Sequence, residues 1–205
     1  PYRHTSCRTW PSAATTNTQR IIATQYIMTI NDKLLDHLPT INAMRHRYAE
    51  SLPVRVLFVC LGNICRSPAA QGILQACINK HGDTDAWIID SAGTGGWHVG
   101  DLPDNRMRIH AQWRGYTLDH ICRQVCDVDF DNFDILIGMD ANNVAKLKHM
   151  APTIEAQDKV VPMIAFVQMP TRQDCIPDPY YDGDDGFENV LTLLEDGCTN
   201  LAKFI

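Results

Sequence analysis

The sequence predicts a single α/β domain in which a four-stranded parallel sheet carries helices on both of its faces. Four short runs rich in β-branched and aromatic residues alternate with segments in which apolar residues recur at helical spacing. The first run is nearly continuous in apolar residues, which is typical of a strand buried on both sides. With 205 residues, 45% of them hydrophobic, the chain can enclose a sizeable core in one domain.

The predicted strands lie at 54–59, 87–90, 133–138 and 159–164. Val, Ile and Phe are frequent in these runs, and such residues favour the pleated, buried chain of a sheet. Pro162 lies within the fourth run, where it cannot donate a ladder hydrogen bond, which is unfavourable in a sheet interior.

Helices are predicted after the first strand, after the third strand and at the C-terminus. Pro68 suits a first helical turn, where the backbone N–H would have no partner anyway. Asp140 is placed to cap the helix that follows the third strand. The apolar face of the first helix comprises Ala70, Ile73, Leu74, Cys77 and Ile78, and that of the last comprises Phe187, Val190, Leu191, Leu194, Cys198, Leu201 and Ile205.

The N-terminal quarter of the chain differs in composition from the rest. Residues 1–31 contain no Asp or Glu, are rich in Thr, Ser and Arg, and show no sustained period. Such a segment is typical of a transit peptide, a flexible extension or sequence upstream of the natural protein. We therefore treat residues 1–50 as a disordered extension without an assigned function, whose deletion leaves activity and melting temperature unchanged, and place the domain at 51–205.

The distribution of charge argues against nucleic acid as a partner. Residues 1–53 carry six Lys or Arg against three Asp or Glu, whereas residues 54–205 carry twelve against twenty-one. Nucleic-acid binding depends on clustered cations, so an anion bound to this acidic body must be held by a local site.

The cysteine content and hydropathy exclude two further classes. Eight cysteines are too few for a disulfide scaffold, and none has the spacing of a structural zinc site, so a reducing compartment is expected. No apolar run approaches the roughly 18 residues that a membrane span needs, so no membrane association is expected.

A phosphate-binding loop is predicted between the first strand and the helix after it. Its residues are Cys60, Leu61, Gly62, Asn63, Ile64, Cys65, Arg66 and Ser67. At a helix N-terminus, unpaired backbone N–H groups and the positive end of the helix dipole favour an anion. Gly62 and Asn63 tolerate left-handed backbone angles, so the loop can curl with successive N–H groups pointing inward.

Cys60 is the candidate nucleophile, because a thiol among inward N–H dipoles and beside an arginine loses its proton readily. Arg66 would grip two oxygens of a phosphoryl group, and Ser67 would donate a hydrogen bond to the thiolate. A buried core thiol at the end of a strand is the alternative, but Cys followed six positions later by Arg-Ser at a strand-to-helix junction favours catalysis. The implied chemistry is phosphoryl transfer to sulfur followed by hydrolysis.

The chain resembles the low-molecular-weight protein tyrosine phosphatase family over about residues 54–205. The motifs that carry the resemblance are the loop above with Pro68, Ser91-Ala92-Gly93-Thr94, Gly96-Trp97-His98-Val99-Gly100, Met139-Asp140 with Asn142-Asn143, and Asp178-Pro179-Tyr180-Tyr181. The resemblance implies a four-stranded parallel sheet with flanking helices. It also implies cytoplasmic hydrolysis of phosphotyrosine in proteins, without a metal or cofactor and with inorganic phosphate as the product.

Matching positions imply the roles of the three central residues, with Cys60 as nucleophile, Arg66 as phosphate clamp and Asp178 as general acid. Asp178 would protonate the bridging oxygen of the leaving tyrosine and then, once ionised, activate the water that attacks the phosphocysteine.

The resemblance also implies supporting roles. Asn63 would hold the loop through hydrogen bonds to Ser91 and His120. Trp97 and Tyr180 would grip the aromatic ring of the substrate, and Tyr181 would share that role or be phosphorylated as a regulatory site. The alternatives are a core or loop position for Trp97, a structural His120 and a merely solvated acidic loop around the two tyrosines.

Three rival functions remain open. An arsenate reductase on the same fold would use Cys122 and Cys126, although their setting looks more like a phosphatase helix with two substitutions. A phosphate-binding module would lack catalysis, but no required residue is missing. A phosphoarginine phosphatase would strip water from a guanidinium beside the aliphatic Ile64, so this residue favours phosphotyrosine.

Overall fold

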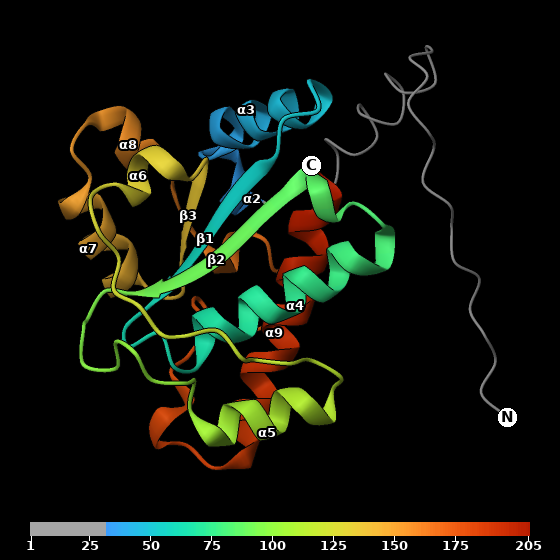
Figure 1. Cartoon of the computed structure of the whole chain (residues 1–205), viewed down its shortest axis with the longest axis vertical. Coiled ribbons are helices and arrows are strands. Elements are labelled where there is room, and N and C mark those ends of the chain that lie inside the picture. Colours follow the sequence, from blue (N-terminus) through green and yellow to red (C-terminus); the bar gives the residue numbers. More distant parts are fainter. Residues whose placement is uncertain (1–31) are drawn as a thin grey trace, which may run out of the picture.

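The computed structural model describes residues 32–205, which form a four-stranded parallel sheet with helices on both faces (Figure 1). The strands are β1 (Val54–Cys60), β2 (Trp87–Gly93), β3 (Ile135–Gly138) and β4 (Val160–Pro162), in the spatial order β2-β1-β3-β4. All neighbouring pairs are parallel. The predicted fold class and the four predicted strands are therefore confirmed, with small differences at their ends.

The helices that surround the sheet are α2 (Asp32–Leu35), α3 (Leu38–Ala49), α4 (Arg66–His81), α5 (Asn105–Trp113), α6 (Asp129–Asn132), α7 (Ala141–Met150), α8 (Ile154–Asp158) and α9 (Asp184–Phe204). Three short 3-10 helices are η1 (Thr84–Ala86), η2 (Met163–Ala165) and η3 (Pro179–Tyr181). The carboxylate of Asp140 accepts a hydrogen bond from the backbone N–H of Asn143, so the predicted cap of α7 is confirmed. None of the helices in residues 32–205 combines the length and apolarity that a bilayer span requires.

Strand β1 is buried because its two faces enter two different cores. Val56 and Phe58 belong to a core that the sheet shares with α3, α4, α5 and α9. Leu57 and Val59 belong to a second core, shared with α6, α7 and α8 on the opposite face. Figure 1 shows these two groups of helices on either side of the sheet. The nearly continuous apolar run of the sequence thus reflects burial on both faces.

The N-terminal helices α2 and α3 lie within the segment that the sequence analysis treated as a disordered extension. Leu34, Ile41 and Met44 are fully buried in the core beside α4 and α9. Thr40 donates a hydrogen bond to the carbonyl of Asp158 at 2.8 Å. Residues 32–50 therefore pack onto the body, which differs from the expectation for this part of the chain. Residues 1–31 lie outside the described part.

The segment that carries Cys122 and Cys126 differs from the helix expected there. It is extended, and it adds to the end of β2 through an isolated bridge between Gly93 and Gln124. Gly93 donates to the carbonyl of Arg123 at 2.9 Å and accepts from the N–H of Val125 at 2.9 Å. This pairing brings the segment against the loop that follows β1.

Candidate active site

The candidate site lies at the carboxyl end of β1, where the chain passes through the loop 60–66 into α4. Cys60 is the last residue of the strand and Arg66 is the first of the helix, and both side chains are buried. Parallel strands end at one edge of the sheet, so the loop also meets the segments that follow β2 and β3. The predicted strand, loop and helix are all present.

The carbonyl groups of the loop are turned outward. The carbonyl of Cys60 accepts a hydrogen bond from the N–H of Thr94, and the carbonyl of Leu61 accepts one from the N–H of Gly95, both at 2.8 Å. The carbonyl of Ile64 accepts from the N–H of Asp104 at 2.8 Å. The carbonyl of Asn63 accepts from the thiol of Cys122, also at 2.8 Å. In a planar trans peptide the N–H points away from the preceding carbonyl. Four outward carbonyls thus direct the following N–H groups into the loop, which is the geometry of an anion-binding nest.

Asn63 is the residue that takes the left-handed backbone conformation, with φ of 58°. The expectation that Gly62 would share it is not met, since Gly62 has no positive φ. At Gly62 the missing Cβ matters instead, because such an atom would lie only 3.2 Å from Cδ2 of His98. His98 was not among the predicted site residues, and no signal in the sequence distinguished it from its neighbours.

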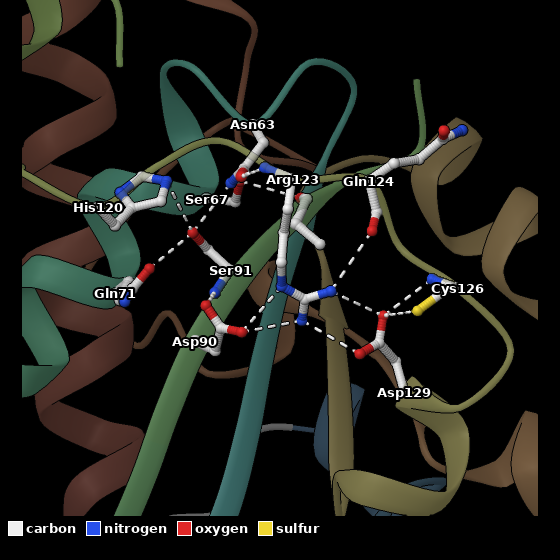
Figure 2. A network of polar contacts seen from close by, with 11 residues as sticks. Asn63, Ser67, Gln71, Asp90, Ser91, His120, Arg123, Gln124, Cys126 and Asp129 are labelled. Carbon is white, nitrogen blue, oxygen red and sulfur yellow. Dashed lines mark hydrogen bonds and ion pairs between the residues drawn. The ribbon is translucent and has the colours of Figure 1, made fainter. Parts of the chain in front are cut away.

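The side chain of Asn63 is fully buried and ties the loop to three other segments, as Figure 2 shows. Its Nδ2 donates to Oγ of Ser67 and to Oγ of Ser91, both at 2.9 Å, and its Oδ1 accepts from the backbone N–H of Arg123 at 2.9 Å. The amide uses both of its hydrogens and its oxygen, so burial leaves none of its polar atoms unpaired. The predicted contact with Ser91 is present.

His120 approaches Ser91 and, within residues 32–205, makes no hydrogen bond to Asn63, which differs from the prediction. Its Nε2 lies 3.4 Å from Oγ of Ser91, and Ser91 donates its own hydroxyl proton to Oε1 of Gln71 at 2.7 Å. Since that proton is used, the contact with His120 requires a proton on Nε2. Burial is the largest cause that lowers the pKa of His120, and Arg123 adds to it while Asp90 and Asp119 oppose it.

Ser67 connects this network to the candidate nucleophile. Its hydroxyl lies 3.1 Å from Sγ of Cys60 and 3.2 Å from the carbonyl of Ala92, and it is the donor to both. A hydroxyl has one proton, so the hydrogen bond to sulfur forms at the expense of the one to Ala92. A negative charge on sulfur would favour the first, because hydrogen bonds to charged acceptors are stronger.

Arg66 is held by two carboxylates. Its Nη1 lies 2.6 Å from Oδ2 of Asp140 and its Nη2 lies 2.7 Å from Oδ2 of Asp178. Burial alone would lower the pKa of Arg66, but the charges of Cys60, Asp178 and Asp140 outweigh it, so that the pKa is raised. Its Nε is buried without a hydrogen-bond partner among residues 32–205, which leaves one donor free at the loop. Asp140 was predicted only as a helix cap.

A pocket of about 130 Å³ opens above the loop. Its walls are Leu61, Gly62, Ile64, Trp97, His98, Tyr180 and Tyr181, with Cys60, Cys65, Arg66 and Asp178 also in contact with it. Trp97 is 72% exposed and Tyr181 is 93% exposed, so neither is a core aromatic. The structure thus brings together the predicted loop, the predicted acid and the three predicted aromatic side chains.

Arg106 positions the aromatic wall, although the sequence analysis did not identify it. Its Nη1 donates to the carbonyl of Tyr180 at 3.1 Å, and its guanidinium lies 5.2 Å from the centre of the Tyr180 ring. Asp104 binds this guanidinium at 2.9 Å, and its own N–H donates to the carbonyl of Ile64. The pair therefore links the aromatic wall to the loop 60–66.

The remaining cysteines near the loop are in different environments. Burial, and less strongly the nearby Asp104, Cys60 and Asp178, raise the pKa of the Cys65 thiol. Burial likewise raises the pKa of Cys122 to about 11. Cys126 is exposed and its thiol lies 3.5 Å from Oδ2 of Asp129. No group of three or more His, Cys, Asp or Glu side chains in the described residues is arranged to hold a metal ion.

Comparison with known proteins identifies one family. A family model described as low molecular weight phosphotyrosine protein phosphatase matches residues 55–205. The low molecular weight protein-tyrosine-phosphatase of Streptomyces coelicolor is 40% identical over 152 residues, which are 74% of this chain and 93% of that protein.

Solved structures agree with this match. A protein tyrosine phosphatase from Entamoeba histolytica, crystallised with Hepes in the active site, superposes with a TM-score of 0.71 at 43% identity, covering 73% of this chain and 95% of that one. A Drosophila arginine phosphatase superposes with a TM-score of 0.67 at 32% identity, covering 72% of this chain and 95% of that one.

Proposed function

This chain belongs to the low molecular weight phosphotyrosine protein phosphatase family, whose members hydrolyse phosphoric monoesters through a phosphocysteine, and we propose that Cys60 forms that intermediate here. The observation that carries the proposal is the loop itself. Its carbonyls are bonded on the outside, its N–H groups are directed inward, and a buried sulfur lies at its base with the hydroxyl of Ser67 at 3.1 Å. Such a nest binds a phosphoryl group and presents it to the sulfur.

In the first step the phosphoryl oxygens occupy the loop and the free Nε of Arg66. The thiolate of Cys60 attacks phosphorus, a sulfur–phosphorus bond forms, and the bond from phosphorus to the tyrosine oxygen breaks. Asp178 lies at the rim of the same pocket and gives its proton to that oxygen, so that tyrosine leaves as a neutral phenol.

In the second step Asp178 is ionised and takes a proton from the attacking water. The water oxygen bonds to phosphorus, the sulfur–phosphorus bond breaks, and inorganic phosphate is released. Ser67 stabilises the departing thiolate through the hydrogen bond that it already makes to Sγ of Cys60. Asp178 thereby gains a proton from water in place of the one that left with the tyrosine.

The pocket walls support phosphotyrosine in proteins as the substrate. Trp97 and Tyr180 offer aromatic surfaces to a phenyl ring, and Ile64 adds an aliphatic surface near the phosphate. The arginine phosphatase among the structural relatives makes phosphoarginine the second candidate. The guanidinium of phosphoarginine would lie beside Ile64, whose side chain offers no hydrogen-bond partner, and this disfavours phosphoarginine as the substrate.

Other functions on this fold have less support. Arsenate reduction would require Cys122 and Cys126 as electron carriers, yet Cys122 already donates to the carbonyl of Asn63 inside the protein. An inactive module would not need Asp178 at the rim of the pocket. A reducing compartment such as the cytoplasm suits the enzyme, because its mechanism depends on a free thiol and the seven cysteines of the described residues are unpaired.

The test compares Cys60→Ser with Cys77→Ser, a matched change of a partly buried cysteine on α4 outside the loop. Turnover of p-nitrophenyl phosphate, with a metal chelator present throughout, should be abolished in Cys60→Ser and retained in Cys77→Ser. Inorganic phosphate should still bind Cys60→Ser within about tenfold of wild type, because the N–H groups and Arg66 remain. Turnover by Cys60→Ser within tenfold of wild type would remove Cys60 from the mechanism. Values of kcat/KM for peptides carrying phosphotyrosine, phosphoserine or phosphoarginine then give the substrate preference.

A further inference from the structure

A second cavity, of about 310 Å³, lies between α4 and the segment 115–120. It is larger than the pocket above the phosphate loop and shares none of its lining residues. Gly72 lies on its α4 side, where a Cβ would meet the Leu118 side chain at 2.6 Å and the carbonyl of Thr117 at 3.3 Å. Because Gly72 has no side chain, the segment 115–120 can pack directly against α4 beside the cavity.

The chemistry of the lining selects against anions. The only carboxylate among the lining residues is Asp119, and none of them is a Lys or Arg. Burial lowers the pKa of His120, so its imidazole is neutral at neutral pH. Carboxamides of Gln71, Gln75 and Asn79 provide donors and acceptors along one face of α4.

Two lining residues also touch the network that supports the active site. Gln71 Oε1 accepts from Oγ of Ser91 at 2.7 Å, and His120 Nε2 lies 3.4 Å from the same oxygen. Figure 2 shows both side chains on the same side of Ser91, with His120 above its hydroxyl oxygen and Gln71 below it. From Ser91 the contacts continue through Asn63 to Ser67, whose hydroxyl reaches the sulfur of Cys60.

We propose that this cavity is a second binding site, for an uncharged heteroaromatic molecule carrying both a hydrogen-bond donor and an acceptor, and that its occupancy strengthens phosphate binding through Ser91. The Nε2 group of Gln71 has no hydrogen-bond partner among the described residues and faces such a ligand as a donor. The half-buried ring of Tyr116 offers it an apolar face.

The coupling has a physical basis in the shared oxygen of Ser91. A ligand bonded to the outer ends of Gln71 and His120 restricts both side chains against Ser91, which restricts Asn63 and hence the loop. A loop already ordered loses less entropy when phosphate arrives, so each ligand strengthens the other by the same factor. The coupling depends on the proposed phosphate-binding role of the loop, whereas ligand binding in the cavity does not. Titration of the protein with inorganic phosphate, without nicotinamide, tests the role of the loop separately.

The probe is nicotinamide, an uncharged heteroaromatic amide, and its control is nicotinate, which has the same ring and a negative charge. Amide chemical-shift changes in the full chain should centre on residues 71–79 and 115–120 for nicotinamide, and nicotinate should bind at least about tenfold more weakly. Saturating inorganic phosphate should tighten nicotinamide binding about fivefold. Shifts centred on Trp97 and Tyr180 with competition by phosphate, or equal binding of nicotinate, would overturn the site.

Two sets of variants test ligand binding in the cavity separately from its coupling to phosphate binding. Ala76→Trp fills the cavity and should abolish nicotinamide binding, and Gln75→Trp does so from the next position if the first variant does not fold. Ser91→Ala, or the size-matched Ser91→Cys if the former unfolds, should keep nicotinamide binding, because Ser91 does not line the cavity, and should lose the effect of phosphate on it. A phosphate effect that persists in both of these variants, or that is missing in wild type, would overturn the route through Ser91.

Discussion

Oδ2 of Asp178 lies 2.7 Å from Nη2 of Arg66, so the proposed general acid and the proposed phosphate clamp form an ion pair. A carboxylate held by a guanidinium is an acceptor and cannot supply a proton. An incoming phosphoryl dianion competes for the same guanidinium and can release Asp178 toward the leaving oxygen. Phosphate binding and the release of Asp178 as the acid are therefore linked through Arg66.

Asp178→Asn should reduce hydrolysis most for substrates with poor leaving groups. We expect kcat for phosphotyrosine to fall about 100-fold or more, because the phenol oxygen must leave without a proton. The loss on p-nitrophenyl phosphate should be much smaller, because its phenolate is a better leaving group. Steady-state kinetics on both substrates check this, with the exposed Asp185→Asn as control. Equal losses on the two substrates would exclude the acid role.

Cys65 should protect Cys60 from irreversible oxidation. Peroxide converts the Cys60 thiolate to a sulfenic acid, and the thiol of Cys65, which borders the same pocket, then displaces water to form a disulfide. Activity of wild type should return after treatment with a thiol, whereas Cys65→Ala should recover little. The exposed Cys126→Ala serves as control. Full recovery of Cys65→Ala would show that the disulfide is not protective.

Met44→Ala should destabilise the protein even though the residue lies outside the part matched by the family model. Met44 is fully buried against the main core, so its truncation should lower the free energy of unfolding by about 2–5 kcal/mol. Chemical denaturation measures this, with the exposed Asn42→Ala on the same helix as control. Deletion of residues 1–50 should likewise lower the melting temperature, contrary to the expectation from sequence. Unchanged stability in both cases would mean that α3 packs only loosely.

Ile64→Thr should shift the substrate preference toward phosphoarginine. The hydroxyl adds a hydrogen-bonding group and leaves more room where the structure has an aliphatic side chain in the pocket wall. Discrimination from one such contact is about 10- to 200-fold, so the ratio of kcat/KM for the two substrates should move within that range. If wild type already prefers phosphoarginine, or if the ratio stays constant, the substrate is selected by Trp97, Tyr180 and Tyr181 instead.

His120→Asn should flatten the dependence of stability on pH just below neutrality. Because burial lowers the pKa of His120 in the folded state, the unfolded chain binds the proton more readily. The contribution of His120 to folding stability is therefore full above the unfolded pKa of about 6.5 and is lost as the pH falls below it. Melting temperatures between pH 5 and 8 should converge for wild type and variant at the acidic end. The exposed His46→Asn is the control, and a parallel pair of curves would contradict the assignment.

The strand, loop and helix from Val54 to His81 could be predicted with their chemistry from sequence alone. Each depends on residues that are neighbours in the chain: a run of apolar residues, a loop with Asn63 able to take a left-handed φ, and a proline in the first helical turn. The helix cap at Asp140 and the C-terminal helix also depend only on residues that lie close together in the chain. Periodicity and helix-end chemistry are properties of short segments, so one sequence displays them directly.

Only the tertiary structure decided what surrounds this unit. Asp140 and Asp178 lie 74 and 112 positions from Arg66, and their contacts depend on the strand order and on where the later loops cross the sheet edge. The extended chain near Cys122 is held by its bridge to Gly93, which overrides the expected helix. The packing of α3 likewise depends on a core that other segments build. Contacts between distant segments leave no periodic pattern in either one, because they arise from complementary shape and burial once the chain has folded.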